Sequence, residues 1–137
     1  MSKSLNTMLK ELDEASRIEK LIGHKDLSRE DVKFLKERAE KAVPRFEFLY
    51  GFYLLLNLEQ KKEADIWFNK AFKHANGIAL WYASGKFAFA ADYLQDDFYI
   101  DWSMRCLRRS AWHQFPLAKM MLQEMKEHPY ERKYPQA

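Results

Sequence analysis

Glycine and proline are scarce in this sequence, with four of each among 137 residues. All-β sandwiches and barrels need turn residues about every eight to twelve positions, so this scarcity argues against an all-β fold. Cysteine is scarcer still, because Cys106 is the only one. The chain therefore cannot form an internal disulfide, and a reducing compartment is expected.

Long hydrophobic runs are also missing. The longest apolar run, "FLYGFYLLL" at residues 48–56, is far shorter than the roughly 20 residues that cross a bilayer. The N-terminal segment, residues 1–20, contains no apolar stretch of signal-peptide length. We therefore expect a cytoplasmic protein without a membrane segment.

Neither sign of charge dominates. Lys and Arg number 23 against 20 Asp and Glu, which gives a net charge of +3. That excess is too small to make nucleic acid the default partner. The sequence also lacks a Ser-His-Asp order, a Gly-rich phosphate loop, an HExxH motif and a CxxC motif. We therefore expect neither enzymatic activity nor a cofactor.

Apolar residues at helical spacing are what the chain has in abundance. Hydrophobic residues make up 47% of it, enough for the core of one domain, and this composition favours an all-α protein. The spacing predicts seven helices. Their expected ranges are about 3–22, 28–43, 44–57, 59–75, 77–92, 97–113 and 116–127. Residues 129–137 contain two prolines and are expected to form a disordered or draped tail.

Particular residues mark the expected helix ends. Gly23 should stop the first helix, and Ser28 should cap the second, which ends before Pro44. Asn76 and the glycine after it form a C-terminal stop signal for the fourth helix. The segment 44–57 is apolar nearly all round, which predicts a helix buried between neighbours. A buried strand is the alternative for its "FLYGFYLLL" run.

A second pattern is internal self-similarity. Residues 63–79 and 102–118 match at an offset of 39 residues. The matched pairs are Ala64/Ser103, Trp67/Cys106, Phe68/Leu107, Lys70/Arg109, Ala71/Ser110, Phe72/Ala111, His74/His113 and Ala79/Ala118. A fainter third copy contains Val32, Ala39 and Pro44. Repetition at one period indicates helix pairs that stack and share a core, with small residues where the helices touch.

The repeated segments resemble a known family. The motif "AxxWFxKAF", formed by Ala64, Trp67, Phe68, Lys70, Ala71 and Phe72, resembles the second helix of Sel1-like repeats, longer relatives of tetratricopeptide repeats. The segment "SxxCLxRSA", which begins at Ser103, resembles a weaker copy. The resemblance implies a short α-α solenoid of antiparallel helix pairs in one domain, residues 1–128. Its expected parts are an N-terminal helix pair at 3–43, repeats at 44–76 and 77–115, and a C-terminal helix at 116–127.

The same resemblance implies a function. Such solenoids bind peptides or proteins along a concave face, so the leading hypothesis is an adaptor that grips a protein segment. The groove positions of tetratricopeptide repeats map onto Arg45, Phe48, Phe52, Trp81, Phe89 and Met120. Large side chains left exposed in a groove are typical of binding hot spots.

Two other functions stay open. A basic cluster could hold nucleic acid or phosphate, although cations also favour the C-terminal part of a helix for electrostatic reasons. This cluster comprises Arg105, Arg108, Arg109 and Lys119. The third hypothesis is a structural homodimer, with the N-terminal helix or the apolar helix at 44–57 as its interface.

The remaining chemistry-bearing residues have structural explanations. His74 and His113 occupy equivalent repeat positions, and Cys106 belongs to the same repeat pattern. A structural zinc site needs four closely spaced ligands, so we expect no metal centre. Among the tryptophans, Trp67 and Trp102 are expected to pack at the interfaces between repeats.

Overall fold

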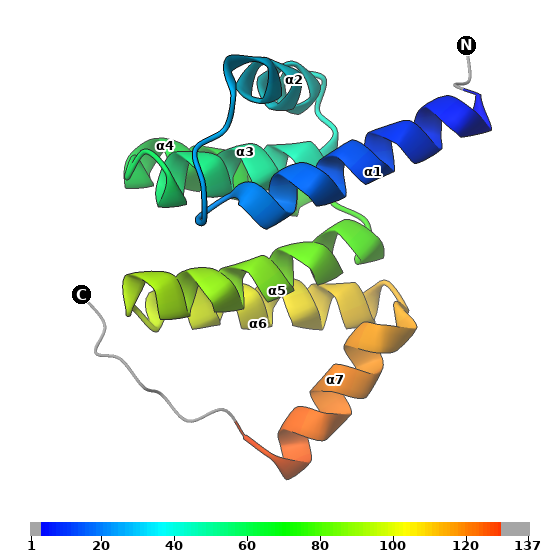
Figure 1. Cartoon of the computed structure of the whole chain (residues 1–137). Helices are drawn as coiled ribbons and strands as arrows, with labels where there is room; N and C mark the ends of the chain where they lie inside the picture. The colour runs from blue at the N-terminus through cyan, green and yellow to red at the C-terminus, as the bar shows by residue number, and fades with distance from the viewer. Residues whose placement is uncertain (1–3, 130–137) are drawn as a thin grey trace.

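The computed structural model describes residues 4–129, and every regular element in that range is an α-helix. The seven helices, labelled in Figure 1, are α1 (Leu5–Leu21), α2 (Arg29–Glu40), α3 (Pro44–Leu56), α4 (Lys61–His74), α5 (Gly77–Leu94), α6 (Phe98–Trp112) and α7 (Pro116–Glu127). The predicted all-α class is thereby confirmed. A strand at residues 48–56 is excluded, because that run lies inside α3. Most of the expected tail, residues 130–137, lies outside the described residues.

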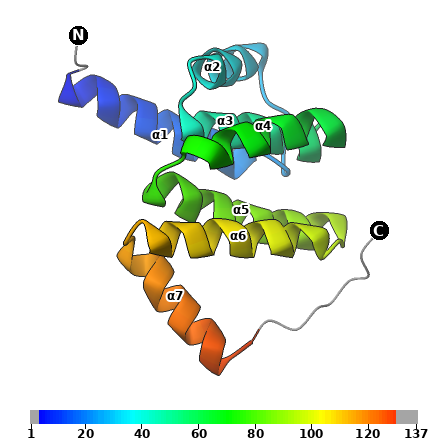
Figure 2. The ribbon, with the colours of Figure 1, turned by 180° about the vertical axis from the view of Figure 1, so that it is seen from behind.

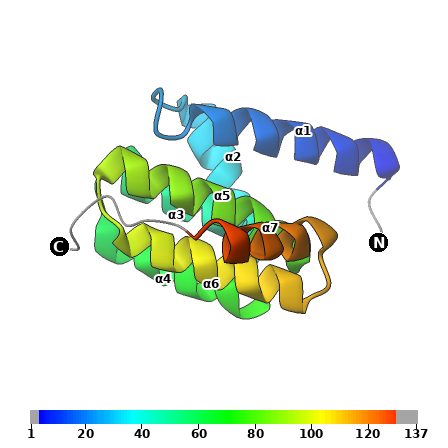
Figure 3. The same ribbon diagram turned by 90° about the horizontal axis from the view of Figure 1, so that it is seen from below.

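Five of the helices, α1 and α3 to α6, form three layers. In the view from below, α3 and α5 lie between α1 on one side and α4 with α6 on the other (Figure 3). The view from behind accordingly has α4 and α6 in front of α3 and α5 (Figure 2). α3 packs against α2, α4 and α5, and α5 also packs along α6. The middle position explains why the sequences of α3 and α5 are apolar on nearly every side.

Aromatic rings fill the space between the middle layer and the α4–α6 layer. The ring centroid of Phe87 in α5 lies 4.7 Å from that of Phe52 in α3 and 4.7 Å from that of Phe68 in α4. Phe87 also stacks on Trp102 of α6 at 5.3 Å. Such ring contacts add about 0.5–1.5 kcal/mol each beyond the area that they bury. Trp102 thus packs in the core as the sequence predicts, whereas Trp67 is only half-buried.

The matched small residues of the repeat lie at helix contacts. Ala71 of α4 has no exposed surface. In α6 the corresponding residues are serines, whose hydroxyls donate to carbonyls of α5: Ser103 to Ser84 at 2.8 Å and Ser110 to Gly77 at 2.6 Å. A serine remains almost as small as alanine, and its buried polar atom is satisfied by the carbonyl. The sequence offset therefore corresponds to a shared packing role.

The helix ends follow local chemistry. Gly23 has a φ of 85°, a left-handed conformation that glycine adopts freely, and it ends α1. Ser28 caps α2, because its Oγ accepts the N–H of Asp31 at 3.1 Å. α4 ends where the sequence predicts, yet Asn76 acts on the next helix: its Oδ1 accepts the N–H of Ala79 at 2.9 Å, at the start of α5. The stop signal is thus in part an N-cap, since asparagine suits both roles.

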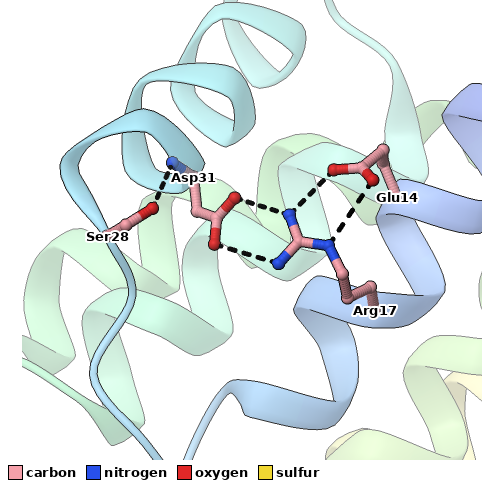
Figure 4. Close-up of polar contacts among 4 residues, drawn as sticks. All are labelled: Glu14, Arg17, Ser28 and Asp31. Carbon is pink, nitrogen blue, oxygen red and sulfur yellow. Dashed lines mark hydrogen bonds and ion pairs between the residues drawn. The ribbon is translucent and has the colours of Figure 1, made fainter.

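Side chains fasten α1 to the rest of the molecule. Arg17 lies between Glu14 of its own helix and Asp31 at the start of α2, with N–O distances of 2.8 and 2.6 Å (Figure 4). Arg45 of α3 pairs with Glu19 of α1 at 3.2 Å. Ion pairs therefore link the two helices of the expected N-terminal pair, while α2 packs on α3.

Both ends of the fold carry exposed apolar faces. The N-terminal half of α1 extends past α3, and α7 diverges from α6 (Figure 1). The exposed apolar residues at these places are Leu5, Met8, Leu9 and Leu12 on α1, and Leu117, Met120 and Met121 on α7. On α1 their spacing of three and four residues places them on one face of the helix.

Candidate functional site

A large cavity opens where α1, α5 and α7 approach one another over part of α6. Its volume is about 590 Å³. We call it the inner groove. Its lining residues are Ser16, Glu19 and Lys20 of α1; Trp81, Tyr82, Ser84, Gly85, Lys86, Ala88 and Phe89 of α5; Ser103 and Leu107 of α6; and Met121 and Met125 of α7.

Small residues of α5 form part of the lining. Ala88 lies three residues after Gly85 and four after Ser84, so it neighbours both on the helix surface. The Ser84 hydroxyl is hydrogen-bonded to that of Ser103 at 3.2 Å. A Cβ built on Gly85 would meet no heavy atom within 4 Å, so the space above this glycine is open. Glycine inside a helix is about 1 kcal/mol less favourable than alanine. Among residues 4–129, no neighbour requires its small size here.

Large apolar side chains stand beside these small ones. Trp81 is half-buried, and its ring centroid lies 5.8 Å from that of Phe115 in the turn before α7. Phe89 lies further along α5, with its ring 4.9 Å from His24. On the opposite side α7 contributes two methionines. Methionine is flexible and polarisable, so it adapts to different apolar surfaces.

Two cations join α1 to the middle layer beside the inner groove. Lys86 Nζ donates to the carbonyls of Glu19 and Ile22, at 3.0 and 2.9 Å, at the C-terminal end of α1. Burial lowers the pKa of Lys86 below its ordinary value, and the Glu19 carboxylate opposes that shift. The Arg45 guanidinium contacts Glu19 and lies 4.2 Å from the ring centroid of Tyr82.

The structure brings some of the predicted partner-binding residues to this site. Trp81 and Phe89 line the inner groove, and Arg45 lies at its edge through its contacts with Glu19 and Tyr82. Met120 is 67% exposed on α7, and the groove lining uses its neighbour Met121.

Two predicted partner-binding residues need correction. Phe48 and Phe52 are 2% and 1% exposed and pack on Phe87, so neither presents a surface to a partner in this structure. The reason is the middle position of α3, which is covered by α1 on one side and α4 on the other (Figure 3). The mapping from the repeat family assumes that one side of this helix is open.

Sequence reasoning missed several lining residues. Lys20, Lys86, Met121 and Met125 border the inner groove without any motif to mark them. Gly85 is the exception, because the small residues around it in the sequence, Ala83, Ser84 and Ala88, would allow another helix to approach closely.

The four residues of the predicted basic cluster make different contacts. The guanidinium groups of Arg105 and Arg109 lie 5.0 and 4.7 Å from the ring centroid of Phe72. Arg108 borders a depression of about 370 Å³, which Arg105 also borders. Lys119 donates to the side chain of Gln114 in the turn before α7. The ring contacts give Arg105 and Arg109 roles in packing as well as in surface charge.

Cys106, His74 and His113, which the sequence marks as candidates for chemistry, do not line the inner groove. Burial raises the pKa of Cys106 to about 12, so its thiol is protonated at neutral pH. His74 Nε2 lies 2.5 Å from a carboxylate oxygen of the fully buried Glu47. His113 lies against Trp112, with centroids 5.1 Å apart. Among residues 4–129, no three His, Cys, Asp or Glu side chains are grouped so that they could hold a metal ion.

A scan against protein-family models found no match, and searches of curated proteins and of solved structures found none either. Within the described part of the chain, no helix combines the length and the apolar character that crossing a membrane requires.

Proposed function

We propose that this protein is a non-enzymatic adaptor that holds a segment of a partner protein in the inner groove. The observation that carries the proposal is the groove itself. It is an open cavity of about 590 Å³ in which large apolar side chains lie beside Gly85, and the space above that glycine is empty. Binding sites of proteins are typically concave and mostly apolar, with few polar groups. Trp81 is the main anchor, because it is large, half-buried and part of the lining.

The proposed architecture is a short α-α solenoid of antiparallel pairs. The 39-residue offset and the shared burial of Ala71 and Ser110 support it, because equivalent contacts recur at one period. Helices α3 with α4, and α5 with α6, are the pairs that would stack. In this arrangement α1 covers part of the inner face (Figure 1), and the inner groove is the cavity that α1, α5, α6 and α7 line beside it.

The test of the adaptor function is to fill the groove without disturbing the fold. Gly85→Leu should be accommodated, because the Cβ position is free and leucine favours helix. The variant and the parent protein are then used to capture partners from an extract of the native host. We expect proteins retained by the parent and by Gly85→Ala to be lost from Gly85→Leu. Equal retention by all three proteins would refute binding in the inner groove.

Self-association is a second candidate function, favoured by the apolar face of α1. Met8 and Leu12 of that face border a depression of about 390 Å³, which Val43 and Phe46 also line. Exposed apolar patches of this kind mark interaction surfaces. Sedimentation at micromolar concentration should then give a dimer that Leu9→Glu dissociates. A monomeric parent protein would rule this candidate out.

A further inference from the structure

The charge around the inner groove is unbalanced. Lys20 is exposed on the α1 side, and Lys86 lies in the lining with its charge directed to helix carbonyls. Glu19 is the carboxylate of the lining, and Arg45 already pairs with it at 3.2 Å. Among the described residues at this site, the cations Lys20, Lys86 and Arg45 therefore outnumber the carboxylate of Glu19. A partner with acidic side chains would be complementary to this positive charge.

The groove is built for contact with an apolar surface rather than for backbone pairing. All its walls are helices, whose interior N–H and C=O groups bond within the helix, so no sheet edge is present for an added strand. Among the described residues, no buried side-chain atom that lacks a hydrogen-bond partner belongs to the lining. Recognition in the groove therefore depends on apolar burial, with charge acting at the rim.

The open space above Gly85 favours a helix as the occupant of the groove. A helix that lies along α5 can approach closely at a residue without a Cβ, and larger side chains on either side then enclose it. Trp81 and Phe89 flank Gly85 on α5, and Met121 and Met125 of α7 line the same groove. Methionine-lined grooves accept apolar helix faces of varied sequence.

We propose that the occupant of the inner groove is an acidic amphipathic α-helix of a partner protein. Its apolar residues, spaced i, i+3, i+4 and i+7, pack on the small residues of α5 and the methionines of α7. Its acidic residues lie toward Lys20. This inference rests on the proposed adaptor function and adds the chemistry of the partner.

The test is selection from random peptides displayed on phage, of about 16 residues each, which corresponds to roughly 24 Å of helix. The full chain is the bait, and the selected peptides are synthesised and measured by fluorescence anisotropy. We expect the selected peptides to be acidic, with apolar residues at helical spacing, and to gain helical circular dichroism when bound. Lys20→Glu should weaken their binding by about tenfold, and more at low salt than at high salt.

Lys33→Glu is the matched control, because it makes the same charge change at an exposed site on α2. It should leave peptide affinity within about twofold of the parent value, because Lys33 does not line the groove and salt screens interactions between exposed charges. Equal weakening by both charge reversals would contradict specific recognition at the rim of the groove.

The outcomes separate this inference from the function on which it rests. Proline-rich, extended or basic peptides that bind the parent protein but not Gly85→Leu would overturn the acidic helix and leave the groove as the binding site. Peptides that bind Gly85→Leu as well as the parent protein would refute both. Self-association of the parent that Gly85→Leu abolishes would identify a second copy of this chain as the occupant, and would likewise overturn the proposal.

Discussion

Gly85 and Gly51 are two helical glycines with opposite surroundings. A Cβ on Gly85 would meet open space, whereas a Cβ on Gly51 would lie 2.6 Å from Cε1 of Phe68. Gly85→Ala should therefore raise the free energy of unfolding by about 0.5–1 kcal/mol through helix propensity alone. Gly51→Ala should lower it by about 1–3 kcal/mol, because the core must shift to admit the new methyl group.

Urea denaturation of both alanine variants measures this contrast. The two changes add the same atoms to two helices, so intrinsic helix propensity cancels in the comparison. If Gly85→Ala destabilised the protein as much as Gly51→Ala, the space above Gly85 would be filled in solution, and the inner groove would be closed.

Cys106 gives a second prediction at the residue scale. Burial raises its pKa from 9.0 to about 12, and the nearby Arg105 only partly opposes this. The native protein should react with a thiol reagent at neutral pH only when it unfolds, because the thiolate is the reactive form. Ile66→Cys, on the exposed face of α4, should add one fast-reacting thiol as the control. Rapid modification of the parent protein would show that Cys106 is accessible.

Single residues also show how far the sequence predicts the packing. The repeat offset correctly marks Ala71 and Ser110 as buried contacts, because small residues recur wherever two helices touch. The apolar character of residues 44–57 on nearly every side also predicts a buried helix, and Phe48 and Phe52 are indeed buried in it. The mapping from the repeat family, which places both residues in an open groove, is therefore wrong for these two positions.

At the scale of elements, the helix ranges follow the sequence closely. Observed ends differ from expected ends by at most two residues for six of the seven helices, because Gly, Pro and cap residues act locally. The largest difference is at the end of α2, which stops at Glu40 while the expected helix runs on toward Pro44. Ala42 adopts a φ of 60° there, a left-handed turn that the sequence does not mark with a glycine.

The link between α1 and α2 yields a prediction about pH. Asp31 accepts hydrogen bonds from Arg17, and these lower its pKa below the ordinary 3.8, with a smaller contribution from Ser28. A carboxyl whose pKa is lower in the folded state stabilises the fold above its ordinary pKa. That contribution is lost as the pH falls through the ordinary value and then through the lower value of the folded state. Arg17 is 45% exposed, so the pair should contribute only about 0.5–1 kcal/mol at neutral pH.

Asp31→Asn should therefore destabilise the protein by about that amount at pH 7, and the difference from the parent protein should vanish at acidic pH. Thermal melts at a series of pH values measure the effect. Asp13→Asn removes the same charge from an exposed position on α1 and serves as the comparison. A difference that stays constant across the acidic range would mean that the ion pair does not form in solution.

At the scale of the whole molecule, the placement of α1 is what the sequence does not predict. Each helix can be recognised from its own apolar spacing, but the order of layers depends on contacts between distant segments. Lys86 and Glu19 are 67 positions apart, yet their hydrogen bond holds α1 over α5. No periodic pattern encodes such a contact. The inner groove depends on it, because α1 forms one of its walls.

In an adaptor, an anchor residue of the groove can be removed with a large loss of binding and only a small loss of stability. Trp81 and Trp102 test whether this holds here. Trp102 is buried among Phe68, Phe72 and Phe87, so Trp102→Ala should cost about 3–5 kcal/mol of stability. Trp81 is half-buried and faces the inner groove, so Trp81→Ala should cost only about 1–2 kcal/mol. Its larger effect should be on peptide affinity, which we expect to fall by about 2 kcal/mol, as for other hot-spot residues. Denaturation and anisotropy measured on the same two proteins give both quantities. Unfolding of Trp81→Ala to the same extent as Trp102→Ala would make Trp81 a core residue and would leave the inner groove without its anchor.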